Sequence, residues 1–351
     1  MAVASDLSSA YERRSVLVTG GASFIGSHLV EELAQLGADV VVVDDFSSGR
    51  RDNLMAVPHD RVLEVDLSDR VQTMSDLPSC EIVFHLAAVH GGRGFIDTYP
   101  DQVLVNLAID NNVLTACRRV GTRHLVHASS ACVYPTTLQA KTASRHLLAE
   151  DEAGFDAPGK AFSDGAYGWG KIMGEFQLEQ FVRRGPMTGA SARIFTAYGE
   201  RENESHAAIA LIAKALLRIE PYPIWGDGLQ TRNFTYVADT VRGLLFLGTL
   251  GGREVPFRAV NVGSSTHHTV LDFLDVLFDL IGWRPHLIER QTWRPVGVAS
   301  RASDNMLTRE LFGWEPQTSL RRGIGRTLEW YAARHDRPTT GEELEELLNA
   351  R

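Results

Sequence analysis

A serine, a tyrosine and a lysine near the middle of the chain have the types and spacing of a proton-transfer set. Ser130 ends an apolar stretch, and Tyr167 precedes Lys171 by four residues. Because residues four apart share one face of a helix, we expect Lys171 to lie beside Tyr167 and to lower its pKa by favouring the phenolate. Cys132 adds a thiol two residues after the serine. These four residues predict acid–base chemistry on a small substrate.

A glycine-rich turn near the N-terminus predicts a dinucleotide site ahead of this set. The apolar stretch 15–19 predicts a strand, and the following residues turn into a helix whose apolar positions recur at helical spacing. Gly20 permits the tight bend, and Gly26 lets the helix pack close to the strand. The N-terminus of this helix then offers N–H groups to a pyrophosphate.

Two aspartates, Asp44 and Asp45, follow the second predicted strand at 38–43. A carboxylate at this point accepts hydrogen bonds from the adenosine ribose and repels a 2′-phosphate, so the sequence favours NAD over NADP. Two alternatives stay open at this stage. Both aspartates could be ordinary loop acids, and Arg50 and Arg51 could support NADP.

The remaining pattern predicts an α/β fold with a doubly wound parallel sheet of Rossmann type. Further strands are predicted at 62–66, 81–86, 123–129 and 190–195, with helices at 99–120 and 167–184. The alternation changes after Tyr198, where a smaller C-terminal α/β substrate domain is expected. The predicted parts are an NAD-binding domain at 15–198 with a return of the chain at about 233–262, a substrate domain at 199–232 and 263–335, a tail at 1–14 and a C-terminal extension at 336–351.

Composition excludes several other kinds of protein. The 351 residues carry a formal net charge of -9, which argues against a nucleic-acid partner because phosphate backbones bind basic surfaces. Cys80, Cys117 and Cys132 lack the paired spacing of metal ligands and cannot all form internal disulfides, so we expect no metal and a reduced, cytoplasmic setting. No apolar run has the length of a signal-peptide core or a membrane span, and we expect no membrane partner.

From about Ser15 to Leu328, these motifs and their order resemble the nucleotide-sugar epimerases and dehydratases among the extended short-chain dehydrogenases/reductases. The resemblance implies NAD as the cofactor and Ser130, Tyr167 and Lys171 as the catalytic set. Ser23 stands where the family has a third glycine, so the turn departs from the family pattern there. The cofactor-binding residues that the resemblance implies are Gly20, Ser23, Phe24, Ile25, Gly26, Asp44, Asp45, Asp66, Leu67, Leu86, Ala87, Ala88, Asn106, Tyr167 and Lys171.

Three segments, at 91–96, 129–135 and 297–305, are similar to a narrower group, the GDP-mannose 3,5-epimerases. This similarity implies an acid/base role for Cys132. Where that group has a second acid/base lysine, the chain has His206, and its surroundings instead resemble the GDP-fucose synthases, which pair a cysteine with a histidine. The substrate-binding residues implied are Gly91, Gly92, Arg93, Ser130, Cys132, Thr196, Asn203, Glu204, His206, Lys214, Gln230, Arg232 and Arg301.

The combined hypothesis is an NAD-dependent epimerase of a nucleotide-diphosphate sugar, with a GDP-hexose favoured and a homodimer expected. A transient ketone at C4 would acidify the neighbouring carbons. Cys132 and His206 would exchange their protons, since a thiol of pKa about 8.5 and an imidazole of pKa about 6.5 need little tuning at neutral pH. Dehydration is disfavoured because Ala131-Cys132 stands where dehydratases have an Asp-Glu pair.

Three alternatives to this function stay open. The first is an epimerase/4-reductase of GDP-fucose-synthase type, and the second is a nucleotide-sugar 4-epimerase in which Cys132 only fills space. The third is a catalytically silent protein on the same fold. His206 could also be a simple surface or helix-capping residue, and Arg232 and Arg301 could belong to surface ion pairs.

Overall fold

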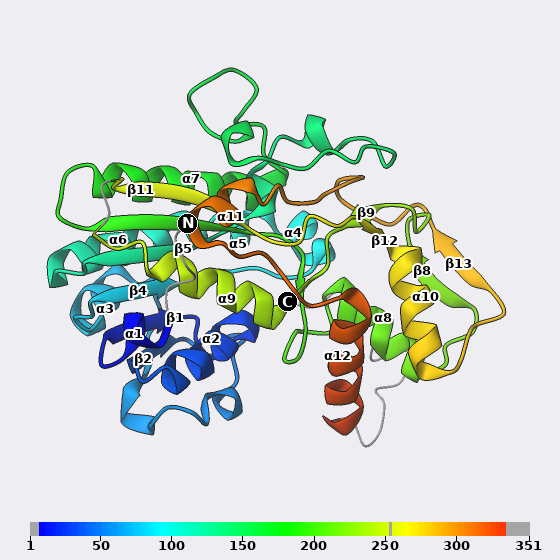
Figure 1. Cartoon of the computed structure of the whole chain (residues 1–351), viewed down its shortest axis with the longest axis horizontal. Coiled ribbons are helices and arrows are strands. Elements are labelled where there is room, and N and C mark those ends of the chain that lie inside the picture. The colour runs from blue at the N-terminus through cyan, green and yellow to red at the C-terminus, as the bar shows by residue number, and fades with distance from the viewer. Residues whose placement is uncertain (1–6, 253–254, 335–351) are drawn as a thin grey trace.

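Seven parallel strands form the central sheet of the computed structural model, which describes residues 7–252 and 255–334 (Figure 1). They are β1 (Ser15–Thr19), β2 (Asp39–Asp44), β3 (Val62–Glu64), β4 (Ile82–His85), β5 (His124–Ser130), β6 (Thr188–Ile194) and β11 (Phe257–Val262). Their order is β11-β6-β5-β4-β1-β2-β3, so the chain runs outward from β1 to β3 and then returns to β4 beside β1. In doubly wound folds, ligands bind beyond the carboxyl ends of the strands at this reversal.

Helices cover both faces of the sheet, because alternate residues of each strand point to opposite faces. Val16 of β1 belongs to the apolar cluster that contains Leu29, whereas Leu17 belongs to the other cluster, with Leu114 and Leu178. The helices that supply these clusters are α2 (Phe24–Gln35) and α9 (Val237–Gly248) on the first face, and α3 (Arg70–Asp76), α6 (Asn106–Val120) and α7 (Gly165–Val182) on the second. The predicted α/β fold with a doubly wound parallel sheet is confirmed.

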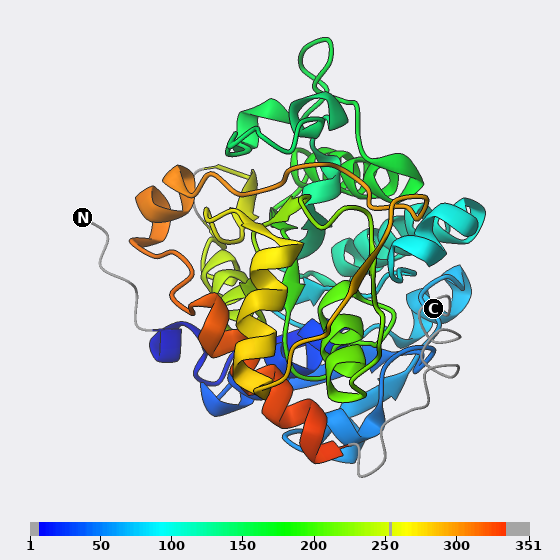
Figure 2. The ribbon, with the colours of Figure 1, turned by 90° about the vertical axis from the view of Figure 1, so that its right-hand side faces the viewer.

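A smaller group of elements lies beside the sheet, on the right of Figure 1 and toward the viewer in Figure 2. Its members are α8 (Ala207–Leu216), β8 (Tyr222–Trp225), β9 (Thr231–Arg232), β12 (His268–Thr269), α10 (Val270–Ile281), β13 (Ile288–Gln291) and α12 (Leu320–Arg334). Helix α10 packs against α8 and α12, β8 pairs with β13, and β9 pairs with β12. Between the two groups, β11 returns to the large sheet beside β6, in the region where a return was expected.

Short elements complete the described chain. They are α1 (Leu7–Tyr11), α4 (Arg93–Thr98), α5 (Pro100–Val103), α11 (Met306–Phe312), β7 (Ala197–Tyr198), β10 (Thr235–Tyr236) and the 3₁₀ helices η1 (Arg51–Leu54), η2 (His59–Arg61), η3 (Ala131–Val133), η4 (Thr136–Gln139) and η5 (Glu150–Glu152). Within the described ranges, no helix combines the length and apolarity needed to cross a membrane. The C-terminal extension expected at 336–351 lies outside the described residues.

Two segments differ from the sequence-based prediction. Residues 7–14, expected as part of a tail, include helix α1, and the fully buried Tyr11 donates a 2.5 Å hydrogen bond to the carbonyl of Leu245. The helix expected at 99–120 is divided into α5 and α6. Pro100 begins α5, and α6 starts at Asn106. The side chain of Asn106 is hydrogen-bonded to the backbone of Val89.

His85, the last residue of β4, lies in a buried polar network beneath the reversal point. Its Nδ1 is 2.7 Å from the hydroxyl of Thr19, and its Nε2 is 3.1 Å from a carboxylate oxygen of Asp110. The other oxygen of Asp110 is 3.6 Å from Nε2 of His127. The network ties β1, β4 and β5 to α6, and burial lowers the pKa of His85 even though Asp110 opposes this effect.

His124 gives the fold a testable pH dependence. Its buried ring lies 2.8 Å from the Thr188 hydroxyl and 3.0 Å from the Leu247 carbonyl, and burial lowers its pKa to about 4. Because the unfolded chain takes up this proton near pH 6.5 and the folded chain does not, the stability contribution is complete above pH 6.5 and is lost as the pH falls toward 4. Between pH 7.5 and 5 the loss amounts to about 2 kcal/mol.

We therefore expect His124→Gln, which keeps an amide donor for Leu247, to lose about 2 kcal/mol less free energy of unfolding than the native chain between pH 7.5 and 5. Urea unfolding at both pH values measures this difference. Equal losses in the two proteins would show that the folded and unfolded chains take up a proton at His124 over the same pH range.

Candidate active site

The turn between β1 and α2 depends on two glycines with no room for a side chain. Gly20 has a φ of 69°, and a Cβ atom there would lie 2.7 Å from the backbone nitrogen of Ala87. A Cβ atom on Gly26 would lie 2.1 Å from the carbonyl oxygen of Gly20. Ser23, the departure from the family pattern, turns its hydroxyl back to this same carbonyl at 2.7 Å and precedes the first residue of α2. The serine is thus accommodated without displacing the turn.

The two aspartates after β2 line a cavity together with Gly20, Asp66 and Leu67. Asp44 accepts hydrogen bonds from the backbone N–H groups of Ala22 and Phe46, each at 2.9 Å, and burial raises its pKa. The carboxylate therefore braces the dinucleotide turn from below, a role that the sequence did not reveal.

Arg51, the basis for keeping NADP open, is engaged elsewhere in the structure. Its guanidinium pairs with Glu64 and lies 3.9 Å from the centre of the Phe46 ring. These contacts hold the arginine beside the adenosine cavity in a pose that already satisfies its charge.

The cavities in this part of the structure fit a dinucleotide. A narrow one is lined by Gly20, Ser23, Asp44, Asp45, Asp66, Leu67, Leu86, Ala87 and Ala88, and a second one continues it from Ser23, Phe24 and Ile25 to Ser130, Tyr167 and Lys171. Asn106 does not line either cavity; its amide group holds the backbone of Val89 at 2.7 and 2.9 Å. It therefore positions the wall of the narrow cavity, which Val89 lines.

The predicted catalytic trio converges at the end of β5. Ser130 is the last residue of this strand, and Lys171 on α7 donates a 2.8 Å hydrogen bond to the carbonyl of Ala128. The Lys171 ammonium lies 5.8 Å from the centre of the Tyr167 ring. All three residues line one cavity of about 350 Å³.

The expected effect of Lys171 on Tyr167 is wrong for the protein chain alone. Burial raises the pKa of Tyr167, the nearby Cys132 adds to the rise, and the hydrogen bond to Ser130 opposes it. Burial likewise lowers the pKa of Lys171, against the charges of Asp110 and Glu175. Sequence spacing correctly predicted that the two side chains lie close together. Removal from water is nevertheless the largest influence on both pKa values.

Cys132 is held by a close contact between η3 and α7. A Cβ atom on Gly168 would lie 2.3 Å from the carbonyl oxygen of Cys132, and the same carbonyl accepts a 2.9 Å hydrogen bond from the N–H of Asp164. Arg301 donates to the sulfur at 3.2 Å. This contact fixes the direction of the thiol within the cavity.

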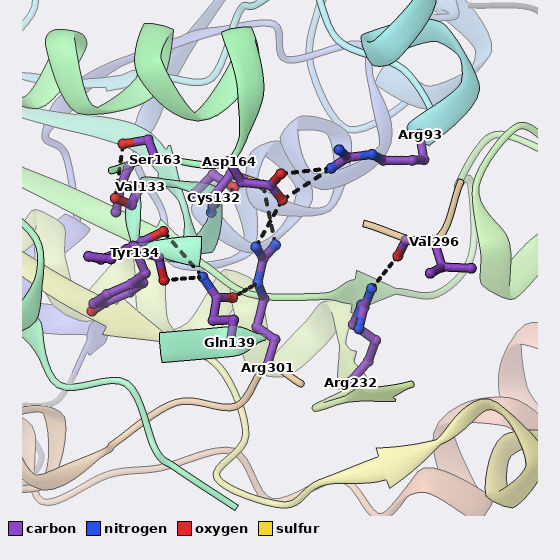
Figure 3. A network of polar contacts seen from close by, with 12 residues as sticks. Arg93, Cys132, Val133, Tyr134, Gln139, Ser163, Asp164, Arg232, Val296 and Arg301 are labelled. Carbon is purple, nitrogen blue, oxygen red and sulfur yellow. Dashed lines mark hydrogen bonds and ion pairs between the residues drawn. The ribbon is translucent and has the colours of Figure 1, made fainter. Parts of the chain in front are cut away.

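Three arginines belong to the same site as this thiol, and Figure 3 shows them with Asp164 and Cys132. Asp164 accepts bonds from Arg93 at 3.0 and 3.1 Å and from Arg301 at 3.1 Å, and Arg301 also donates to Gln139 at 2.6 Å. Arg232 instead donates to the backbone carbonyls of Thr231 and Val296, each at 2.7 Å. Burial, with a smaller effect of Arg301, lowers the pKa of Arg232 to about 10.

His206 faces the trio from the start of α8. Its Nδ1 lies 3.1 Å from a carboxylate oxygen of Glu202, and its ring centre is 5.6 Å from that of His90. Burial raises the pKa of Glu202, and the bond to His206 opposes the rise. A Cβ atom on Gly92 would lie 2.1 Å from the carbonyl of Ser205, so the glycine-rich loop fits directly against the turn that carries His206.

The structure brings most of the predicted site residues into two connected cavities. The cavity of about 350 Å³ contains Gly91, Gly92, Ser130, Lys171 and His206, and the second, of about 290 Å³, contains Lys214, Gln230 and Arg232. Arg93, Cys132, Tyr167, Thr196 and Arg301 line both. Asn203 and Glu204 are not among the lining residues of either one; Asn203 accepts a 2.9 Å bond from the N–H of Ser205 and shapes the turn before His206.

Three polar residues of the site escaped the sequence analysis: Asp164, Glu202 and His90. Asp164 precedes Tyr167 by three residues, where an aspartate is expected as a helix cap. Glu202 precedes His206 by four residues, a spacing that signals a contact only within a helix, and these residues lie before one. His90 adjoins the glycines of the substrate loop, and that position was its one available signal.

Comparison with known proteins identifies the group to which the fold and site belong. A family model described as the NAD dependent epimerase/dehydratase family matches residues 16–263. UDP-glucuronic acid decarboxylase 2 of Arabidopsis thaliana is 34% identical over 88% of this chain and 66% of its own length. GDP-mannose 3,5-epimerase 1 of Oryza sativa subsp. indica is 29% identical over 91% of this chain and 82% of its own. UDP-glucose 4-epimerase of Thermus thermophilus, solved with NAD, superposes with a TM-score of 0.75 at 26% identity, over 92% of this chain and 99% of that one.

These similarities confirm the resemblance inferred from the motifs, the cofactor NAD and the class of NAD-dependent sugar-nucleotide epimerases. The cavities described above fit that assignment, since the dinucleotide turn and the Ser130, Tyr167 and Lys171 trio open into one continuous space. The relatives are named for different sugar nucleotides. The substrate of this chain must therefore be argued from its own residues.

Two glycines of α7 allow a test of how tightly Cys132 is held. Gly168→Ala would drive a methyl group against the carbonyl of Cys132, whereas a Cβ atom on Gly170 meets nothing within 4 Å. We expect Gly168→Ala to lower the free energy of unfolding by more than about 1 kcal/mol and to change the rate at which a disulfide reagent modifies Cys132. Gly170→Ala should leave that rate unchanged and stabilise the helix by up to about 1 kcal/mol.

Urea unfolding and thiol labelling of the two variants check this expectation without any knowledge of the substrate. Cys80 and Cys117 are buried, so labelling of the folded protein reports on Cys132. Equal behaviour of the two alanine variants would contradict the contact between α7 and η3.

Proposed function

We propose a function for this chain on the premise that it belongs to the NAD dependent epimerase/dehydratase family. The chain inverts carbons beside C4 of a nucleotide-diphosphate hexose, with GDP-mannose as the favoured substrate. The observation that carries this proposal is that Cys132 and His206 line the same cavity as Tyr167 and Lys171. A 4-epimerase needs no second acid/base pair at this place. Two further proton-exchanging groups have a purpose when carbons next to a ketone are inverted.

The roles of the residues follow from their positions. Bound NAD supplies the chemistry of taking hydride from C4 and returning it. Tyr167 takes the proton of the 4-hydroxyl group in its phenolate form. Burial disfavours this form, and the positive charge of oxidised NAD would favour it. Ser130 orients the phenol by a hydrogen bond, and Lys171 holds the end of β5 through the carbonyl of Ala128. The 4-ketone that results acidifies the hydrogens on C3 and C5.

Cys132 and His206 then act on those carbons. Cys132 contacts Arg301 through its sulfur and is assigned as the base. Glu202 contacts Nδ1 of His206 and leaves Nε2 for the substrate, so His206 is assigned as the acid. Proton removal by one group and delivery by the other inverts the carbon between them.

Arg232 supports a diphosphate as the linking group. Among the described residues it makes no ion pair with a carboxylate, and its guanidinium is bonded only to carbonyl oxygens. A buried cation without a counter-charge is costly, so a phosphate at this point would stabilise it. The cavity that Arg232 lines also contains Lys214, Gln230 and Trp225, which leaves space beyond the diphosphate for a nucleoside.

A second candidate is a nucleotide-sugar 4-epimerase, because a UDP-glucose 4-epimerase aligns along nearly the whole chain. In that case Cys132 and His206 would have no part in the reaction. An epimerase/4-reductase would consume NADPH, and Asp44 with the paired Arg51 makes the adenosine cavity a poor site for a 2′-phosphate.

We also propose a homodimer through α6 and α7. Several large apolar side chains on or next to these helices are exposed, namely Tyr99, Leu104, Val105, Trp169 and Phe176. Exposed apolar side chains on these helices are suited to contact with a second copy of the same chain. With three free cysteines among the described residues, a cytoplasmic enzyme remains our expectation.

The test is incubation of the NAD-loaded enzyme with GDP-mannose in heavy water, followed by NMR of the sugar. We expect deuterium at C3 or C5 of the product and no net consumption of cofactor. Cys132→Ser and His206→Asn should each slow this incorporation by about a hundredfold or more, because each removes one proton-transfer group. Both variants should still exchange hydride at C4, and Cys80→Ser should behave as the native enzyme.

Two results would replace the proposal. A C4 epimer without deuterium at C3 or C5 would establish the 4-epimerase, and stoichiometric oxidation of NADPH would establish the 4-reductase. Full incorporation by Cys132→Ser or His206→Asn would remove that residue from the acid/base pair.

A further inference from the structure

Asp164 occupies a place where its side chain would ordinarily cap a helix, but it faces the cavity instead. It is the N-cap residue of α7, and its side chain makes no capping hydrogen bond with the helix. Both carboxylate oxygens accept bonds from guanidinium groups, one from α4 and one from the segment after β13. An aspartate that does not cap its helix gives up part of the stability of that helix. The orientation toward the arginines therefore calls for an explanation.

The two arginines bound by Asp164 already have their charges balanced by the protein. Arg93 pairs with Asp97 at 2.8 Å and with Asp164 at 3.0 Å, and Arg301 pairs with Asp164 at 3.1 Å. Two guanidinium groups thus face two carboxylates. In the same cavity, Arg232 is bonded to carbonyl oxygens and makes no ion pair with a carboxylate among the described residues.

This balanced cluster lies where the sugar must react. Arg301 is bonded both to the sulfur of Cys132 and to Asp164, and Figure 3 shows Asp164 between the two guanidinium groups, beside Cys132. Arg93 and Arg301 line both cavities, and Asp164 lines the one that continues toward Arg232. A sugar ring that reaches the sulfur is therefore in the immediate neighbourhood of the Asp164 carboxylate.

We infer that Asp164 is a specificity-determining residue, because its carboxylate balances the charges of Arg93 and Arg301 within the protein. The site therefore accepts a nucleotide sugar with an uncharged hexose and rejects one whose sugar carries a carboxylate. This inference rests on the proposed function for the identity of the reaction, and it adds the class of sugar that the reaction takes.

The electrostatics support the rejection of a sugar acid. Burial would raise the pKa of Asp164, but the charges of Arg301 and Arg93 outweigh it and lower the pKa, so the carboxylate is ionised at neutral pH. A second carboxylate would have to compete for the same guanidinium groups and would be repelled by the first.

The contrast with relatives gives the inference its content. One relative of comparable similarity is by name a decarboxylase of UDP-glucuronic acid, a sugar acid. A neighbourhood of arginines alone would suit such a carboxylate well. In this chain, the carboxylate of Asp164 already pairs with these guanidinium groups.

The experiment measures preference and not activity alone. NAD-loaded native enzyme, Asp164→Asn and Asp164→Ser are titrated calorimetrically with GDP-mannose and with the corresponding GDP-sugar oxidised to a carboxylate at C6. Serine is a good helix N-cap, so Asp164→Ser keeps α7 intact if the amide variant folds poorly. We expect the ratio of the two dissociation constants to move at least tenfold toward the sugar acid in both variants.

Two controls separate this role from a purely structural one. Asp97→Asn removes a carboxylate from the outer side of Arg93 and should change the ratio by less than about twofold, because Asp164 still satisfies that arginine. Asp164→Glu keeps the charge and should keep the native preference for the neutral sugar. A structural brace would instead weaken both ligands equally in every Asp164 variant.

The outcomes are distinct from those of the proposed function. An unchanged ratio in Asp164→Asn and Asp164→Ser, or a native enzyme that already prefers the sugar acid, would overturn the inference. If GDP sugars do not bind, the same ratio is measured with UDP-glucose and UDP-glucuronic acid. Failure of deuterium incorporation would refute the inversion chemistry while leaving the preference ratio as an independent result.

Discussion

The close packing of α7 against the end of β5 is the constraint on which the site depends. Gly168 brings the helix so near to η3 that no side chain fits between it and the carbonyl of Cys132. One turn of helix then carries Tyr167 to Ser130, while Lys171 reaches back to the strand at Ala128. Tyrosine, serine, lysine and thiol are in one place because a single helix-to-strand contact fixes all four.

Buried polar networks make this contact rigid from below. Glu175, one turn after Lys171, is bonded to Ser129 and to Arg193, and Arg193 also reaches the hydroxyl of Tyr134. Asp110 of α6, which takes part in the other network with His85, approaches so closely that a Cβ atom on Gly174 would lie 2.4 Å from its oxygen. These groups are satisfied mainly by one another. They fix the helix in one position, since moving it would strand charges in the interior.

Local sequence was sufficient where the chemistry is local. The strand-and-glycine turn from β1 to α2 follows from periodicity and backbone sterics, and the spacing of Tyr167 and Lys171 follows from helix geometry. Both were predicted for this reason. The helix at the N-terminus was missed because the buried Tyr11 bonds to Leu245, which lies 234 residues away in the sequence. The predicted lowering of the Tyr167 pKa was wrong because burial raises this pKa, and burial is a property of the assembled fold.

The same limit explains the polar residues that the sequence did not reveal. Asp164 looks like a helix cap until the fold brings Arg93 from one side and Arg301 from 137 residues further along the chain. Glu202 has a role only because His206 turns its ring toward the cavity. Motif resemblance supplied Cys132, His206 and the arginines, but it could not say which charges the protein would balance by itself.

Charge balance also separates the two ends of the cavity. Around Cys132, guanidinium and carboxylate groups pair within the protein, and this pairing keeps Arg301 oriented toward the sulfur when no ligand is bound. Around Arg232, the guanidinium is held by carbonyl oxygens, which fix its direction without cancelling its charge. The first arrangement is suited to a neutral ring that must be positioned for proton transfer. The second is suited to binding an anionic linker, such as the diphosphate of the proposed substrate.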